Sequence, residues 1–433
     1  MTSASIAPWL STSRWPTVPI RYVAKLGTGH TPSRNVPEYW ENCTVPWVTL
    51  ADVWQLRDGT VDVIKDTKEK ISQLGLANSS AVKYPAGTVI LSRTASVGFS
   101  AILGADMATT QDFATWTCGP RLDRRYLLHA LRAMASDLKR VAAGSTHKTI
   151  YMPDIEQLRI PLPSLDEQRR IADFVDGATK AVDSLVAATG RQFALLDAKL
   201  LEFLRVMTTS GGTTELSSTG VPWMPKMASG WTLHKLSRIF ATGSGTTPRS
   251  DNPAYFDGPY GWVNTADLRD SVIFRTGRTV TTEALRVHSA LKVYRPEALI
   301  VAMYGATVGR VGVLDSDACV NQACCVLYRP TGMRVKYLFH WFVAHRSEIM
   351  SLASGGGQPN ISQELVRSFR VPAPDLAGQD CLLADIDRYT ERIGVERAHL
   401  AARMKLLGER RQALITAAVT GQIDVSTARG IEV

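Results

Sequence analysis

The sequence has few cysteines, and they show no metal-binding or disulfide pattern. The six residues are Cys43, Cys118, Cys319, Cys324, Cys325 and Cys381. No Cys-x-x-Cys pair occurs and no cysteine groups with histidines, which argues against zinc and against a disulfide framework. We expect these cysteines to be small buried side chains in a reducing compartment.

Long hydrophobic runs are also missing. The longest uncharged apolar stretch, residues 298–309, has 12 residues, whereas a helix that crosses a bilayer needs about 20. The N-terminus, MTSASIAPWLSTSRWP, has no basic segment followed by an apolar run, so it does not resemble a signal peptide. We therefore expect no membrane segment and a cytosolic protein.

Signatures of catalysis are absent as well. There is no glycine–lysine phosphate loop, no Gly-x-Ser-x-Gly elbow, no nuclease box and no histidine pair at helical metal spacing. The eight histidines are scattered. A chain of this length without a catalytic constellation is predicted to recognise or scaffold rather than to catalyse, with no metal and no cofactor of its own.

What the chain does have is enough apolar content for more than one core, and an excess of positive charge. Hydrophobic residues make up 45% of the 433 residues and charged residues 21%, which favours two to three folded domains. The formal charge of +9 favours a polyanionic partner. Solvated lysines and arginines alone could also explain so modest an excess.

The sequence is written twice. TGHTPSRNVPEYW (28–40) recurs as TGSGTTPRSDNPAYF (242–256), and VPWVTLADV (45–53) recurs as YGWVNTADL (260–268). YPAGTVILSRTASVG (84–98) corresponds to YRPEALIVAMYGATVG (294–309), and Gln111 corresponds to Gln322. The offset drifts only from 216 to 211, as small loop deletions would leave it. We infer a tandem duplication.

Each copy has two parts. The first, roughly 15–165 and 225–375, has short apolar segments broken by turn residues, which predicts a β or α+β domain. The second follows PLPSLDEQ or PAPDLAGQ, where Ser164 or Asp375 could cap a helix, and is free of proline for about fifty residues.

The two proline-free segments share a heptad register at an offset of 211. This shared register predicts that two long helices pack on each other, although each could instead lie on its own domain. The residues expected to pair the helices are Ile171, Val175, Val182, Leu185, Leu196, Leu382, Ile386, Ile393, Leu400 and Leu407.

Two fragments resemble parts of an adenine methyltransferase. Gly243-Ser244-Gly245 is similar to a cofactor-binding turn, and Asn252-Pro253-Ala254-Tyr255 is similar to the box that holds a flipped base. Gly243 and Asn252 are only nine positions apart, which leaves no room for the strands and helices between such motifs. The other copy reads NVPEY at the box position. We interpret both fragments as turn and core residues.

The assembled pattern resembles the specificity (S) subunit of Type I restriction–modification systems. RIPLPSLDEQRRIADFVD (159–176) is similar to the start of that family's central spacer helix, and RVPAPDLAGQDCLLADID (370–387) is its weaker copy. ALITAAVTGQIDV (413–425) resembles the end of the second spacer helix, and the Thr-Gly…Thr-Pro turns resemble the entrance to each target-recognition domain. Ala377-Gly378 replaces the acidic pair Asp166-Glu167, so a partner contact made by those acids would be asymmetric.

The resemblance implies an α+β protein with two pseudo-repeated globular target-recognition domains, joined by two long helices that form an antiparallel coiled coil. The expected divisions are target-recognition domain 1 (1–165), spacer helix 1 (166–210), target-recognition domain 2 (211–375), and spacer helix 2 with the C-terminal tail (376–433).

The same resemblance implies a function. Each domain would read one half of a bipartite asymmetric site in double-stranded DNA, and the helices would fix the spacing. Two modification subunits would bring S-adenosylmethionine, and restriction (translocase) subunits would use ATP and Mg. A stand-alone DNA-binding scaffold and an adenine-N6 DNA methyltransferase acting alone are the alternatives.

Candidate DNA contacts are polar or cationic residues in the turns and loops of each copy. They are Arg34, Arg93, Ser96, His147 and Lys148 in the first copy, and Arg249, Tyr304, Thr307, Arg310, Gln358 and Asn360 in the second. Each could equally be a solvated surface residue. The basic segment 121–140 is interpreted as a packing helix rather than a DNA-binding helix, because its apolar residues recur at helical spacing.

Overall fold

The computed structural model describes residues 8–142, 149–353 and 360–425. The chain divides into two compact units. Unit 1 comprises Met1–Arg191 and Ala401–Val433, and unit 2 comprises Gln192–Leu400. Each unit therefore contains one globular copy of the repeat, together with part of each long helix.

Unit 1 is built on two mixed sheets. The first has the order β2 (Ala24–Thr28), β10 (Phe113–Cys118), β7 (Val89–Ser92), β8 (Ser100–Leu103) and β4 (Val63–Ile64). The second has the order β5 (Glu69–Ile71), β3 (Val45–Val48), β9 (Met107–Thr109) and β6 (Lys83–Tyr84). All residues of β7 and β8 are buried, which explains why both read as continuous apolar segments rather than as alternating ones.

Unit 2 repeats this topology. Its first sheet has the order β15 (Ala241–Gly243), β22 (Cys324–Tyr328), β19 (Leu299–Ala302), β20 (Val311–Leu314) and β17 (Ser271–Ile273). Its second sheet has the order β18 (Thr279–Val280), β16 (Phe256–Val263) and β21 (Ala318–Val320). In the first sheet the registers correspond, since Val89 faces Trp116 in unit 1 as Leu299 faces Leu327 in unit 2. In the second sheet of unit 2 the counterpart of β6 is reduced to an isolated bridge between Tyr294 and Ala318.

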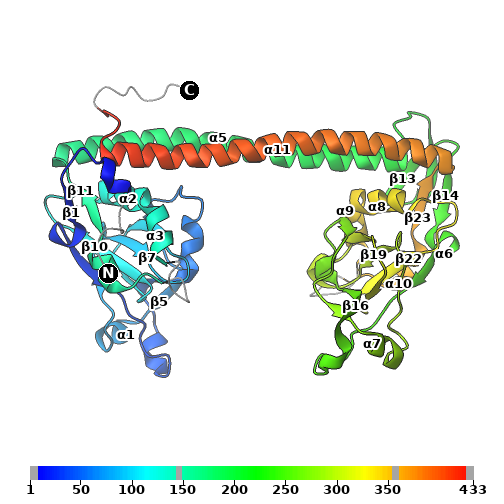
Figure 1. Cartoon of the computed structure of the whole chain (residues 1–433), viewed down its shortest axis with the longest axis horizontal. Helices are drawn as coiled ribbons and strands as arrows, with labels where there is room; N and C mark the ends of the chain where they lie inside the picture. The colour runs from blue at the N-terminus through cyan, green and yellow to red at the C-terminus, as the bar shows by residue number, and fades with distance from the viewer. Residues whose placement is uncertain (1–7, 143–148, 354–359, 426–433) are drawn as a thin grey trace. The chain divides into compact units, whose positions relative to one another are not determined.

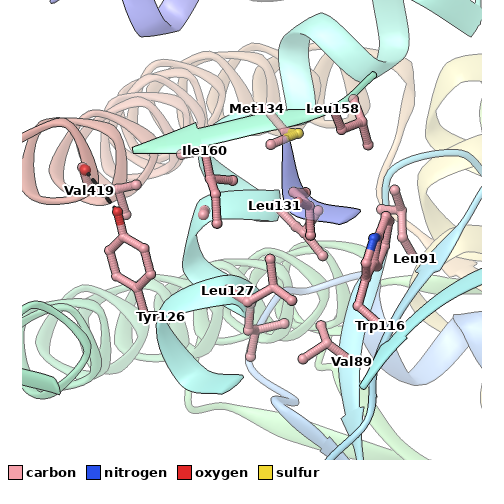
Figure 2. Packing of buried hydrophobic residues seen from close by; sticks show 14 of the residues in the cluster. Val89, Leu91, Trp116, Tyr126, Leu127, Leu131, Met134, Leu158, Ile160 and Val419 are labelled. Carbon is pink, nitrogen blue, oxygen red and sulfur yellow. Dashed lines mark hydrogen bonds between the residues drawn. The ribbon is translucent and has the colours of Figure 1, made fainter. Parts of the chain in front are cut away.

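A helix packs on the first sheet in each unit: α2 (Arg124–Ala133) in unit 1 and α8 (Val335–Ala344) in unit 2. The apolar face of α2, which includes Leu127 and Leu131, is fully buried beside Trp116 and Leu91 (Figure 2). Two basic side chains of α2 form ion pairs outside this core: Arg125 with Asp173 and Asp176, and Arg132 with Asp62. The predicted packing helix is thus confirmed, although it ends at Ala133 and α3 (Ala135–Ala142) follows.

Two 45-residue helices, α5 (Leu165–Thr209) and α11 (Leu376–Thr420), follow the two globular parts (Figure 1). Both begin at the predicted caps. The Ser164 hydroxyl accepts a hydrogen bond from the Glu167 N–H at 3.3 Å, and the Asp375 carboxylate accepts one from the Gly378 N–H at 2.8 Å.

The long helices contact each other within each unit. In unit 1, Asp183 of α5 pairs with Arg411 of α11 at 2.9 Å. In unit 2, Asp197 pairs with Arg397 at 2.9 Å, and the ring of Phe203 stacks on Tyr389 at 3.9 Å. As positions advance along α5 their partners recede along α11, so the pairing is antiparallel. The expected α+β fold with two long antiparallel helices is confirmed.

Burial along the predicted seam is uneven. Ile171, Val175 and Val182 are buried in unit 1, whereas Leu185 and Leu400 are only half-buried. The other residues expected to pair the helices, all of them buried, are Leu196, Leu382, Ile386, Ile393 and Leu407. Many of these side chains also pack on the globular part of their unit, as Ile171 and Ile386 do. The division of the chain at residues 165, 210 and 375 stays a prediction.

A buried tyrosine ties each globular part to both long helices. Tyr126 of α2 donates to the carbonyl of Pro161, just before α5, at 2.9 Å, and lies 3.4 Å from the carbonyl of Val419 on α11 (Figure 2). In unit 2, Tyr337 of α8 does the same with Pro372, before α11, and with Thr208 on α5. Each globular part is thus closed by the start of one helix and the end of the other.

The expectation that all cysteines are buried is wrong for part of the set. Cys319, Cys324 and Cys325 are buried, and burial raises the pKa of the Cys319 and Cys325 thiols to about 12, which leaves them protonated and inert. Cys43 and Cys118 are half-buried, and Cys381, on α11, is exposed. No helix in the described part of the chain has the length and hydrophobicity needed to cross a bilayer.

Two buried histidines are expected to make unit 2 less stable in acid. Burial among apolar side chains lowers the pKa of His340 and of His345 to about 4. The unfolded chain therefore binds more protons than the folded one between about pH 6.5 and pH 4. As the pH is lowered through this window, we expect the free energy of unfolding to decrease, by up to about 1.4 kcal/mol per pH unit for each histidine.

Urea denaturation at pH 7, 5.5 and 4.5 measures this dependence. Replacing both histidines by glutamine is expected to flatten it, whereas the same change at the exposed His399 leaves it unchanged. An equal slope in all three proteins would contradict the prediction.

Candidate nucleic-acid interface

The Thr-Gly…Thr-Pro turn leaves the edge strand of the first sheet and crosses to the second sheet in both units. A Cβ at Gly29 would lie 1.8 Å from the carbonyl oxygen of Thr109, and a Cβ at Gly245 would lie 1.7 Å from that of Val320. A tyrosine hydroxyl holds the turn by a hydrogen bond in each unit. Tyr84 donates to the Thr28 carbonyl and Tyr294 donates to the Ser244 carbonyl, both at 2.7 Å. Glycine is needed at both positions because the backbone of the turn lies so close to the backbone of the second sheet that a side chain would clash with it.

These contacts explain the methyltransferase-like fragments. Gly243 lies against the ring of Tyr294, with a Cβ position 2.2 Å from its hydroxyl, and Gly245 lies against β21. The Asn252 side chain accepts a hydrogen bond from the Ala254 N–H at 3.1 Å, which caps a short turn, and Tyr255 packs edge-on against His288 at 5.0 Å. All four residues thus have structural roles.

A glutamine holds the turn in each unit. The Thr31 hydroxyl donates to Gln111 Oε1 at 2.8 Å, and the Thr247 hydroxyl donates to Gln322 Oε1 at 2.7 Å. Both glutamines are exposed, and their amide nitrogens have no hydrogen-bond partner among the residues that the structure describes. Neither glutamine is among the candidate DNA contacts predicted from the sequence, although their correspondence in the repeat is a signal that points to them.

A second loop lies beside this glutamine. It follows β7 at residues 93–98 and β19 at residues 303–309. Its first backbone N–H donates to the segment that follows the glutamine, Arg93 to Asp112 and Met303 to Ala323, both at 2.8 Å. Positive φ values at Ala95 and Gly305 show that the two loops turn at the same point.

A third segment closes the site. The backbone N–H of Ile150 donates to the Arg93 carbonyl at 2.8 Å, and that of Ile361 donates to the Met303 carbonyl at 2.9 Å. Isolated bridges pair Thr94 with Thr149 and Tyr304 with Asn360. We call these four parts of one unit its recognition cluster. In unit 1 they are the turn 28–32, the loop 93–98, Gln111 and the segment 149–150. In unit 2 they are the turn 242–248, the loop 303–309, Gln322 and the segment 360–361. His147, Lys148 and Gln358 immediately precede the closing segments and lie outside the described residues.

The candidate residues of unit 1 differ in their surroundings. Arg93 points inward: its guanidinium donates to the Ile150 carbonyl at 3.3 Å, and its Nε is buried. Ser96 is half-buried, and its carbonyl accepts a hydrogen bond from Ser92. Arg34 is exposed, but it pairs with Glu69 at 3.3 Å and stacks over Trp40 at 4.3 Å. Arg34 is therefore held in one orientation, which suits base reading better than diffuse phosphate attraction.

The candidate residues of unit 2 are more exposed to solvent. Tyr304 is 41% exposed, Asn360 and Arg310 are exposed, and Thr307 is half-buried. Arg249 pairs with Asp251 at 3.1 Å across an exposed turn. Arg310 has no ion-pair partner among the described residues, so its charge is available to an anion. The DNA-binding role of every candidate stays a prediction.

Within the described residues, no three His, Cys, Asp or Glu side chains group as a metal site would need. What the geometry defines is a duplicated scaffold that presents loops of different sequence from the same positions.

The sequence matches the type I restriction modification DNA specificity domain twice, over residues 12–186 and 228–402. The chain belongs to this family, and the resemblance identified from its sequence is confirmed. It is a specificity protein and not a catalytic subunit.

The chain is also similar to individual specificity subunits in sequence and to a solved structure in fold. The chain is 22% identical to the specificity subunit of the type I restriction enzyme MjaIX of Methanocaldococcus jannaschii, over 68% of this chain and 67% of that protein. It is 24% identical to the EcoR124I/EcoR124II specificity subunit of Escherichia coli, over 40% of this chain and 43% of that protein. A chain solved in work on complex assembly and conformational transition of the type I R-M system has the same fold, with a TM-score of 0.65 and 18% identity over 94% of this chain and 98% of that one.

Proposed function

We propose that this chain is the DNA-reading subunit of a type I restriction–modification complex that acts in the cytoplasm. Each recognition cluster reads one half of a bipartite, asymmetric site in double-stranded DNA, and the paired helices α5 and α11 fix the gap between the halves. Two modification subunits dock on the chain and bring S-adenosylmethionine, while restriction subunits add ATP- and Mg-dependent translocation.

One observation carries this proposal: the two clusters have the same hydrogen-bonded frame but different side chains. The threonine–glutamine bond and the loop-closing bonds recur within 0.1 Å, whereas Thr94 and Lys148 are replaced by Tyr304 and Pro359. A shared frame with different loop residues is what two readers of different sequences require, because base contacts specify while the frame only positions them.

Mapping methylated adenines in cells with and without this gene tests the proposal. We expect deletion to abolish methylation at one bipartite motif with a fixed gap. Purified chain mixed with DNA and labelled S-adenosylmethionine is expected to transfer no methyl group unless a modification subunit is added. Loss of no motif on deletion would refute the proposal, and methyl transfer by the chain alone would favour the enzyme alternative.

Arg310 and Lys148 are expected to attract phosphates rather than to read bases. Replacing either by alanine should weaken DNA binding at all sequences and reduce the slope of log K against log salt by about 1. Binding isotherms at several salt concentrations measure this effect. The control is Arg388→Ala, which removes the same charge from an α11 residue that pairs with Asp385. A loss confined to one base position of the site would contradict the phosphate role.

A further inference from the structure

A cavity of about 420 Å³ opens in unit 2 beside the first turn of α11. Its lining is mainly apolar, with Val313, Phe339 and Leu383 among the contributing residues. Two further apolar side chains line it and remain open to solvent, since Val272 is 43% exposed and Leu376 is 40% exposed. This is also the helix end at which Ala377-Gly378 replaces the acidic pair of the first copy.

One charge at the cavity forms no ion pair within the part of the chain that the structure describes. Arg334 is paired with Asp380 at 2.7 Å, and Lys336 is paired with Asp387 at 2.7 Å. Glu297 also lines the cavity near Arg334, and the pKa of Arg334 is raised mainly by Asp380 and to a lesser degree by Glu297. The Glu297 carboxylate itself forms no hydrogen bond and no ion pair within 4 Å with any residue that the structure describes. The local charge is therefore negative on a chain whose overall charge is positive.

The backbone at Glu297 is unusual for a residue with a side chain. Its φ is +62°, in the left-handed region that favours glycine, and the same position in unit 1 is Gly87 with a φ of +90°. The two residues make the same hydrogen bond, Glu297 N–H to the Leu314 carbonyl and Gly87 N–H to the Leu103 carbonyl. A glutamate at a glycine position is unfavourable for folding, and such strain is found preferentially at functional sites.

In unit 1 an arginine side chain covers Gly87, the position that corresponds to Glu297. The side chain of Arg124, the first residue of α2, lies over Gly87, with its Cδ 3.4 Å and its Cζ 3.6 Å from the position of a Cβ there. The corresponding first residue of α8 is Val335, which is too short to cover the cavity. Unit 1 thus supplies an arginine from its own chain at this place. Unit 2 has a valine at that position and adds a carboxylate, and the arginine that lines its cavity, Arg334, is paired with Asp380.

We propose that the cavity of unit 2 receives an arginine side chain from a partner polypeptide. Its methylene stem would lie on Phe339 and Leu383, and its guanidinium would pair with Glu297 as a two-pronged donor. The inference rests on the proposed function, in which that polypeptide is a modification subunit. Because the first copy is covered by Arg124, only the subunit at unit 2 makes this contact, and the two modification subunits are held with unequal affinity.

Titration of the full chain with its modification subunit, followed by native mass spectrometry, tests the proposal. We expect wild type to bind two subunits. Glu297→Gln removes the charge and Val335→Arg covers the cavity from within, and each is expected to weaken one of the two binding steps about 10-fold while leaving the other unchanged. The charge control is Glu283→Gln, at an exposed residue that pairs with Arg286, and it should bind like wild type. Melting curves establish that the variants are folded.

A photo-crosslinking residue in place of Phe339 identifies the occupant. We expect the crosslinked peptide to come from the modification subunit and to contain an arginine. Equal affinities for all variants, or a crosslink to DNA, to a second copy of this chain or to a peptide without arginine, would overturn the cavity assignment while leaving the proposed function intact. If wild type bound no modification subunit, the proposed function would itself fail, and this inference with it.

Discussion

Inserting four residues into each long helix, after Ala188 in α5 and after Leu406 in α11, is expected to change the gap in the DNA site by one to two base pairs. Four residues lengthen a helix by about 6 Å at ~1.5 Å per residue, and base pairs are spaced ~3.4 Å apart. Methylation at the original gap should fall about 100-fold or more, because one half-site would then meet the wrong bases, each costing roughly 1–3 kcal/mol. Sequencing of methylated adenines measures both changes.

Both helices must be lengthened together. The Asp183–Arg411 and Asp197–Arg397 pairs lie on either side of the insertion point, so an insertion in one helix alone would break one of them. The matched control places the same four residues after Val425, beyond α11, and should leave the gap unchanged. An unaltered gap in the double insertion would defeat the proposal that the helices set the spacing.

Gly245→Ala is expected to lower the stability of unit 2 by about 3–5 kcal/mol. A Cβ at this position would lie 1.7 Å from the backbone oxygen of Val320, and relieving that clash requires the turn to separate from β21. Gly29→Ala should have the same effect in unit 1, where the distance is 1.8 Å. Denaturation followed by near-ultraviolet circular dichroism measures the loss.

Gly277→Ala serves as the matched control in unit 2. Its Cβ would make an ordinary contact, 3.5 Å from the Asp267 carboxylate, so stability should change by less than about 1 kcal/mol. A Gly245→Ala protein of full stability that had lost affinity for S-adenosylmethionine would show that the glycine turn serves a cofactor. The contacts of Gly243 and Gly245 predict the opposite outcome.

Sequence reasoning predicted the architecture well because the relevant signals are linear. A repeat at a nearly constant offset shows that two parts share a fold, and proline-free heptads ending in Ser164 and Asp375 caps mark long helices. The candidate site was predicted less completely. Loop position and charge predict a DNA contact for Arg93, yet its guanidinium donates to the carbonyl of Ile150, 57 residues away. Side-chain charge gives no signal for the exposed glutamines Gln111 and Gln322, which hold the turns.

The sequence alone determined that this protein is a duplicated recognition protein with two long helices, because duplication, periodicity and turn chemistry depend on residues close together in the chain. Only the tertiary structure decided which helix ends close each globular part, as when Tyr126 meets Val419 across 293 positions. It also decided that Gly245 faces a backbone oxygen and that Glu297, a residue at a glycine position of the repeat, lines a cavity. Such features depend on which distant groups are brought within a few ångströms, and spacing along the chain does not encode that distance.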